Sequence, residues 1–270
     1  RVQRAGRPML EVDPAESRPP HFRLFPSDTG VIDRVGFREL ERQPPGHGQV
    51  EIRVRAAGLN FRDVLKALGL YPSDGGDFLL LGDECAGEIT AVGPGVSDYV
   101  PGDRVLAIAP GSFGSYARSR VEAIVAMPAG MTFENAVTIP IAFLTAYYSL
   151  HWLAQIQAGD KVLIQAAAGG VGLAALQIAK LAGAEVFATA GTPEKRELLR
   201  NLGADHVMNS RTLEFADEIK VLTGGRGVDI VLNSIAGEAI RKGIDSLAPY
   251  GRFLELGKRD IYQDSKFGLW

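Results

Sequence analysis

One segment constrains this chain more than any other: residues 162–180 pass from an apolar strand through a glycine turn into a helix. Val162, Leu163 and Ile164 form a short apolar run typical of a buried parallel strand, and residues 173–180 have the apolar spacing of a helix. A chain that turns back on glycine lets backbone N–H groups approach an anion, which the positive end of the helix dipole also favours. The segment therefore predicts a site for the pyrophosphate of a dinucleotide.

The glycine spacing follows the G-x-G-x-x-G pattern of such sites except at its first position, where Ala167 stands. Alanine is small, so the tight turn can survive the exchange. An ordinary, tightly packed strand–helix junction is the alternative, but the strand before the turn and the helix after it are the context that this pattern requires. We predict that Gly169, Gly170, Val171 and Gly172 bind the cofactor.

Beyond residue 155, strands alternate with helices. The strands are expected near residues 161–164, 185–189, 206–208, 229–232 and 252–256. Strands separated by helices predict an α/β fold with a doubly wound parallel sheet and right-handed crossovers. A full dinucleotide-binding sheet has six strands, so we expect this domain to be C-terminally incomplete.

The first half of the chain has a different pattern. Residues 1–20 are rich in Arg and Pro and predict a linker or disordered arm. Residues 21–130 show short alternating strands, for example 49–55 and 87–93, and predict an irregular β-barrel-like domain. From Thr132 the pattern becomes helical, with a break at Pro140, so the nucleotide-binding domain is expected over residues 131–270.

Composition argues against several classes of function. The 270 residues are 46% hydrophobic with a formal net charge of −3 and no basic blocks, which predicts a globular chain without a nucleic-acid partner. No apolar run reaches the ~18 residues of a membrane helix, and no N-terminal signal pattern is present, so we expect no membrane partner and a cytoplasmic location. Cys85 is the single cysteine and the four histidines lack ligand spacing, so no metal site is predicted.

Four local motifs sharpen this interpretation: Gly58-Leu-Asn-Phe-Arg-Asp-Val-Leu65, Gly82-Asp-Glu-Cys-Ala-Gly87, Gly102-Asp-Arg-Val105 and Leu254-Glu-Leu-Gly-Lys258. With the order of the two domains, they resemble the medium-chain dehydrogenase/reductase superfamily, and above all the enoyl reductase domain of modular type I polyketide synthases and the related animal fatty acid synthase. The likeness extends from about residue 22 to the end. It implies a GroES-like β-barrel domain followed by a Rossmann domain.

Zinc-dependent members of this superfamily carry a Cys ligand before the first helix and a His ligand in a G-H-E turn. Here those places read Asn60-Phe61-Arg62-Asp63 and Gly82-Asp83-Glu84. Without the metal an alcohol cannot be activated as a zinc alkoxide. Hydride addition to a conjugated C=C, whose carbonyl is already an electron sink, suits the residues that remain.

The resemblance implies transfer of hydride from NADPH to the β-carbon of an α,β-unsaturated acyl carrier protein thioester, followed by protonation of the α-carbon. The implied partners are that thioester and the neighbouring synthase domains. Superfamily members often pair, so a homodimer and a monomer are both open.

The choice of NADPH over NADH also follows from residues. An NAD enzyme places Asp or Glu at the end of the second strand, about 20 residues past the glycines. Here that stretch ends at Thr192 without an acid, and Lys195 and Arg196 follow. These groups suit a 2′-phosphate. The alternative is that Lys195 and Arg196 simply lie on the solvent-exposed face of a helix. Arg211 stands at a place where, in the family that this chain resembles, a residue binds the same phosphate.

The proton donor is open. Phe61 stands where some related enzymes carry a Tyr, and a phenyl ring cannot donate a proton. Lys195 is the next candidate from the resemblance, with Glu214 as the acid that could hold it, although Asp217 is close in sequence. A lysine occupied by the 2′-phosphate cannot easily reach the α-carbon, so bulk water is the alternative.

Four further positions complete the candidate site. Asn60, assigned to catalysis, lies where the family approaches the nicotinamide, and Thr145 resembles a contact near its carboxamide. Asn233 and Gly257 follow the fourth and fifth strands, at the carboxyl ends where ligands bind such sheets. A turn role for Asn60 and a helix-backbone hydrogen bond for Thr145 are the alternatives.

Two other functions compete with enoyl reduction. A free-standing, zinc-free NADPH quinone oxidoreductase would share the fold and the cofactor. A nucleotide-binding scaffold without activity would be consistent with Ala167 in the turn and the open proton donor.

Overall fold

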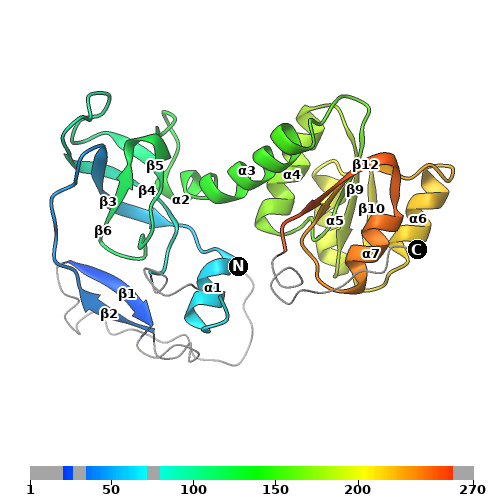
Figure 1. The fold of residues 1–270 in the computed structure, drawn as a ribbon, viewed down its shortest axis with the longest axis horizontal. Coiled ribbons are helices and arrows are strands. Elements are labelled where there is room, and N and C mark those ends of the chain that lie inside the picture. Colours follow the sequence, from blue (N-terminus) through cyan, green and yellow to red (C-terminus); the bar gives the residue numbers. More distant parts are fainter. Residues whose placement is uncertain (1–20, 27–34, 72–79, 258–270) are drawn as a thin grey trace. The chain divides into compact units, whose positions relative to one another are not determined.

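The structure is a computed structural model that describes residues 21–26, 35–71 and 80–257. The chain divides into two compact units between Pro140 and Ile141, and Figure 1 draws both. The boundary lies beyond residue 130 because Ala136 and Val137 pack on Leu106 of the first unit. Three predictions lie outside the described residues: the arm at residues 1–20, the last residue of the Leu254–Lys258 motif, and the absence of a sixth strand.

The first unit is an antiparallel β structure. Its strands are β1 (Phe22–Pro26), β2 (Val35–Glu39), β3 (Gln49–Ala57), β4 (Glu84–Val92), β5 (Arg104–Ile108), β6 (Tyr116–Arg120) and β7 (Ile124–Ala126). Its helices are α1 (Phe61–Ala67), the 3₁₀ turn η2 (Val121–Ala123) and α2 (Phe133–Ala136). Five strands pair in the order β6-β3-β4-β5-β7, and β1 pairs with β2. The predicted irregular β domain of the resemblance is confirmed.

The alternation seen in the sequence places the core of this unit. Along β3, Val50 and Ile52 are fully buried, whereas Arg53 and Arg55 are exposed. The buried side chains pack against β4 and β5, where Cys85 is also enclosed. Burial raises the pKa of the Cys85 thiol to about 12, so this cysteine is a core residue.

The second unit is a parallel α/β sheet with helices on both faces (Figure 1). Its strands are β8 (Lys161–Ile164), β9 (Glu185–Ala190), β10 (His206–Asn209), β11 (Val228–Asn233) and β12 (Leu247–Glu255). Its helices are α3 (Pro140–Tyr147), the π-helix η3 (Tyr148–Leu153), α4 (Gly170–Leu181), α5 (Pro193–Asn201), α6 (Phe215–Leu222) and α7 (Glu238–Asp245). The strand order β10-β9-β8-β11-β12 reverses at β8, so the doubly wound sheet is confirmed, and with it the crevice where such sheets bind ligands.

Successive residues of the buried strands serve opposite faces of this sheet. Ile164 packs with α4 in one core cluster, and Leu163 packs with Phe215 and Ile219 of α6 in another. Both sides are covered, which explains why the strands are apolar runs rather than alternating ones.

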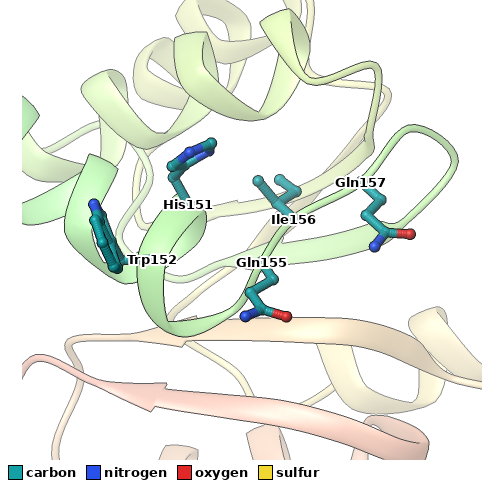
Figure 2. Close-up of a pocket in the computed structure, with 5 residues that line it drawn as sticks. All are labelled: His151, Trp152, Gln155, Ile156 and Gln157. Atoms are coloured by element: carbon teal, nitrogen blue, oxygen red, sulfur yellow. The ribbon is translucent and has the colours of Figure 1, made fainter.

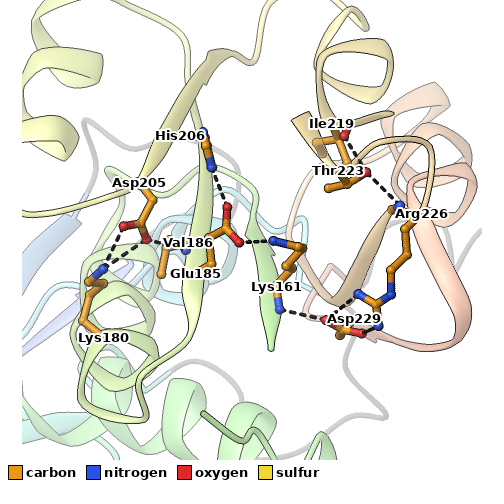
Figure 3. Close-up of polar contacts among 11 residues, drawn as sticks. Lys161, Lys180, Glu185, Val186, Asp205, His206, Ile219, Thr223, Arg226 and Asp229 are labelled. Carbon is orange, nitrogen blue, oxygen red and sulfur yellow. Dashed lines mark hydrogen bonds and ion pairs between the residues drawn. The ribbon is translucent and has the colours of Figure 1, made fainter. Parts of the chain in front are cut away.

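Charged side chains gather where the strands begin (Figure 3). Glu185 accepts from Lys161 and lies 2.7 Å from His206, so the first residues of three strands are joined. Asp229 of β11 accepts from the backbone N–H of Lys161 at 2.9 Å and pairs with Arg226. These contacts tie the amino ends of the strands together and leave the carboxyl ends for the candidate site.

The segment Phe133–Leu153 has the length and composition of a membrane span, because an 18-residue window within it has a mean hydropathy of 1.2; 28% of that window is buried. It is not one uninterrupted helix, because α2 ends at Ala136 and α3 begins at Pro140, as the sequence predicts. Core helices of soluble proteins meet the same criterion, so the segment is weak evidence for a membrane.

Candidate nucleotide site and polar cluster

The glycine turn follows β8 directly. Ala166 adopts a positive φ of 51°, a conformation that costs alanine about 1–2 kcal/mol. Thr189 holds this turn: its hydroxyl accepts from the N–H of Ala166 at 3.3 Å, and its carbonyl accepts from the N–H of Ala167 at 2.9 Å. The strained position is therefore one residue before the place where the sequence pattern expects the first glycine.

Gly172 and Gly170 serve different purposes. A Cβ at Gly172 would lie 2.5–2.6 Å from backbone atoms of Ala167, so this glycine allows α4 to pack closely on the turn. A Cβ at Gly170 would meet nothing within 4 Å. The N-terminus of α4 therefore has open space beside it, as an incoming phosphate requires.

The first turn of α4 offers N–H groups to an anion. Helix α4 has 12 residues, and its N-cap, Gly169, has no side chain to cap it. The amides of Gly170, Val171 and Gly172 precede the first possible intrahelical acceptor. The four residues predicted to bind the cofactor thus converge on one helix end with a favourable dipole.

The groups predicted to bind a 2′-phosphate lie at the end of β9. Thr192 is the N-cap of α5, and its hydroxyl accepts from the N–H of Lys195 at 3.3 Å. A Cβ at Gly191 would lie 2.7 Å from Nε of Arg211, so the guanidinium covers this glycine. Lys195 and Arg211 are exposed, and within the described part of the chain neither has a salt-bridge partner. Two cations therefore stand next to the end of β9.

Glu214 accepts from the hydroxyl of Thr212 at 3.0 Å. Among the described residues, no ion pair joins it to Lys195. The pairing of this acid with the lysine stays a prediction.

Asn233 is fully buried at the end of β11. Its amide donates to the carbonyl of Ile235 at 3.0 Å and to Glu255 at 2.6 Å, and Glu255 accepts from the N–H of Gly257. Both hydrogens of the Asn233 amide therefore form hydrogen bonds within the protein, and this side chain fixes the loop after β11. Sequence reasoning missed Glu255, for which only its place within the quoted Leu254–Lys258 motif was a signal.

Thr145 lies half-buried in α3. Its predicted contact with a cofactor carboxamide stays a prediction.

In the first unit, Asn60 is the N-cap of α1, and its amide nitrogen donates to Oε1 of Glu84 at 2.7 Å. Glu84 begins β4 and is 5% exposed. The sequence places Asn60 among the site residues but gives no sign of this partner.

A second set of charges ties α1 to the turn before β4. Asp83 accepts from both Arg62, at 2.5 and 2.8 Å, and the buried Lys66, at 2.9 Å. Burial opposes ionisation of Asp83, but these two cations outweigh it and hold its pKa below the usual range. The neighbouring Asp63 accepts from the N–H groups of Asn60 and Gly82, yet burial prevails and raises its pKa. In the described residues, no group of three or more His, Cys, Asp or Glu side chains could hold a metal ion.

A separate pocket of about 380 Å³ lies where η3 ends (Figure 2). Its lining residues are His151, Trp152, Gln155, Ile156 and Gln157. None of the predicted site residues lines it.

Two family models match the chain, one for each of its two units. An alcohol dehydrogenase GroES-like domain matches residues 46–146, and a zinc-binding dehydrogenase domain matches residues 170–269. The structure of CurK enoyl reductase is 48% identical with a TM-score of 0.84, covering 93% of this chain and 75% of that one. A mycobacterial protein, Rv1454c, complexed with NADPH is 32% identical with a TM-score of 0.81, over 88% and 73% of the two chains.

The phthioceranic/hydroxyphthioceranic acid synthase of Mycobacterium tuberculosis is 50% identical over 246 residues, which are 91% of this chain and 11% of the synthase. The fold and the likenesses define an oxidoreductase of the medium-chain dehydrogenase/reductase superfamily. Within it, the chain belongs to the enoyl reductases of polyketide synthases. The chain spans about a tenth of the curated synthases that it matches.

Proposed function

We propose that this chain reduces an α,β-unsaturated thioester carried by an acyl carrier protein. Hydride from NADPH goes to the β-carbon and a proton goes to the α-carbon, giving the saturated thioester and NADP⁺. The likeness to CurK enoyl reductase over 93% of the chain carries this proposal. We also propose neighbouring synthase domains as partners, a cytoplasmic location, and a homodimer as one of two possible states.

The residues of the second unit fit NADPH. The open space beside Gly170 and the N–H groups of α4 suit a pyrophosphate. Arg211 and Lys195 are exposed and form no salt bridge with another described residue, so their positive charge suits a 2′-phosphate. No acid stands at the end of β9 to repel that phosphate. When bound, NADPH supplies the hydride.

We also assign roles in the reaction to individual residues of the chain. We assign Asn60 to the reaction centre, and Thr145, Asn233 and Gly257 to the nicotinamide end of the cofactor. Lys195, helped by Glu214, and bulk water are the two candidate sources of the α-proton. The phenyl ring of Phe61 supplies none.

Loss of reduced-nicotinamide absorbance with crotonyl and 2-methylcrotonyl thioesters tests the proposal. Turnover with NADPH, and at least tenfold less with NADH, is the expected result. Turnover with small quinones but not with the thioesters would favour the quinone oxidoreductase. NADPH binding without oxidation by either class would favour the scaffold.

A further inference from the structure

The chain that leaves β10 is fixed by the side chain of Asn209, the last residue of that strand. Its Oδ1 accepts from the backbone N–H of Arg211 at 3.0 Å and from Nη1 of Arg196 at 3.5 Å. An asparagine that accepts from the N–H two residues further on closes an Asx turn, so the backbone bends directly after the strand. This turn sets the direction in which Arg211 leaves β10.

Arg196 of α5 is bound at the same corner of the sheet. Besides its contact with Asn209, its Nη1 donates to the carbonyl of Ala190, the last residue of β9, at 3.2 Å. The same carbonyl accepts from the N–H of Ser210 at 3.2 Å. Arg196 is half-buried, whereas its neighbour Lys195 is exposed. The guanidinium of Arg196 therefore joins the ends of β9 and β10, and the two adjacent cations of α5 differ in their surroundings.

The side chain of Arg211 lies against the glycine that follows β9. A Cβ at Gly191 would lie 2.7 Å from Nε, 3.3 Å from Cζ and 3.4 Å from Nη2 of Arg211. Gly191 does not adopt a positive φ, so it is the space and not the backbone conformation that matters at this position. Arg211 is exposed, and its guanidinium has no salt-bridge partner in the described part of the chain. A cation is thus held at the end of β9 through its backbone and through its side chain.

We propose that Asn209 is a positioning residue that holds Arg211 over Gly191 for the 2′-phosphate of NADPH. Arg196 fixes Asn209 and does not itself bind the phosphate. This rests on the proposed function, in which NADPH supplies the hydride. A guanidinium binds a phosphate through two parallel N–H groups, so its orientation matters as well as its charge. Loss of the Asn209 turn would leave the charge of Arg211 in place and release its orientation.

Binding of two nucleotides that differ only by the 2′-phosphate tests the proposal without turnover. The probes are adenosine 2′,5′-bisphosphate and adenosine 5′-monophosphate, and isothermal titration calorimetry gives the ratio of their dissociation constants. Asn209→Ala is expected to lower the preference for the bisphosphate about fivefold, because the cation stays but its orientation is lost. Asn209→Ser keeps an oxygen that can accept from the N–H of Arg211 and retains most of the preference. Asn201→Ala changes an exposed asparagine at the end of α5 and, as the matched control, leaves the ratio unchanged.

Gly191→Ala acts on Arg211 from the other side. Its Cβ meets a flexible side chain that can move aside, so the preference is expected to fall by a similar factor while the melting temperature is unchanged. Asn209→Ala and Gly191→Ala proteins that both keep the wild-type ratio would overturn the proposal. So would equal weakening of the two nucleotides, since a general loosening of the domain does not depend on the 2′-phosphate.

Double-mutant cycles separate positioning from direct contact with the phosphate. If Asn209 and Arg196 act through Arg211, then Asn209→Ala and Arg196→Ala each cause less than a twofold further loss of preference in an Arg211→Ala background. A larger further loss in Arg196→Ala would mean that this arginine binds the phosphate itself, and would contradict its assignment as a residue that fixes Asn209.

The wild-type protein distinguishes failure of this inference from failure of the proposed function. Equal binding of the two nucleotides by the wild-type protein would refute the preference for NADPH in the proposed function. A wild-type preference for the bisphosphate that survives in Asn209→Ala would refute only the positioning role of Asn209.

Discussion

At the scale of single residues, two glycines of one turn have opposite surroundings. Gly172 packs against the backbone of Ala167, and Gly170 faces open space. The sequence pattern treats both as members of one fingerprint, but in the structure Gly172 is closely packed and Gly170 has open space beside it. We expect that space to be where a ligand approaches the helix.

Exchanging each glycine for alanine separates these roles. Gly172→Ala is expected to lower the free energy of unfolding by about 1–3 kcal/mol, because its Cβ meets backbone that cannot move aside cheaply. Gly170→Ala is expected to leave the melting temperature unchanged, since its Cβ meets nothing, while lowering NADPH affinity. Thermal melts and fluorescence titration with NADPH measure both. Equal loss of stability in the two variants would contradict the assignment.

At the same scale, we expect Arg211 to determine the preference for NADPH over NADH. We expect Arg211→Ala to raise the KM for NADPH roughly tenfold through loss of a charge-assisted contact, and to leave the KM for NADH unchanged. Arg200→Ala is the matched control, because Arg200 is an exposed arginine of α5 that pairs with Glu197. A similar effect of Arg211→Ala on both cofactors would place the arginine outside the 2′-phosphate site.

At the scale of elements, α1 is attached to the turn before β4 by charge. Lys66 on the last turn of α1 is buried and shares Asp83 with Arg62. Buried ion pairs contribute little over apolar packing, but removing one partner leaves the other charge poorly compensated. The orientation of α1, and with it of Asn60 at its N-cap, depends on this arrangement.

Lys66→Met is therefore expected to destabilise the protein by about 3 kcal/mol. Lys180→Met breaks the exposed pair with Asp205, whose side chains are 39% and 35% exposed, and should cost less than about 1 kcal/mol. Urea unfolding of both variants gives the comparison. Equal costs would mean that burial of the Lys66 pair is not what holds α1.

At the scale of the whole molecule, each unit has its own core and its own charged network. In the first unit, burial of Asp83 is outweighed by its two cations, and its pKa is lowered. In the second, Lys161 and then His206 hold the pKa of Glu185 below its usual 4.5. Asp63 acts in the opposite sense, because burial raises its pKa.

These shifts predict how stability depends on pH. Asp83 and Glu185 bind a proton at a higher pH in the unfolded chain than in the folded one. Their contribution to the free energy of unfolding is therefore present above about pH 4–5, and it is lost as the pH falls through the lowered pKa values of the folded state. Protonation of Asp63 offsets part of this loss. Melting temperatures are expected to fall between pH 5 and pH 3, and to fall less in Glu185→Gln. A melting temperature that rises toward pH 3 would contradict the prediction.

Strands were the most predictable elements. The expected range of 161–164 coincides with β8, and the strands β9 to β11 begin and end within a residue or two of their expected positions. Strands buried on both faces are short apolar runs between helices, and this signal is local. The start of β12 was missed, because residues 247–251 contain Pro249 and Gly251, which are typical of a turn.

The sequence by itself determined the two kinds of domain, the position of the glycine turn and the family, since periodicity and motif spacing are properties of consecutive residues. Only the tertiary structure decided that Ala166 takes the strained position, that Glu255 occupies the Asn233 amide and that Glu84 holds Asn60. Each of these contacts depends on how strands and turns distant in sequence pack together, and no local pattern encodes which buried polar group will find which partner.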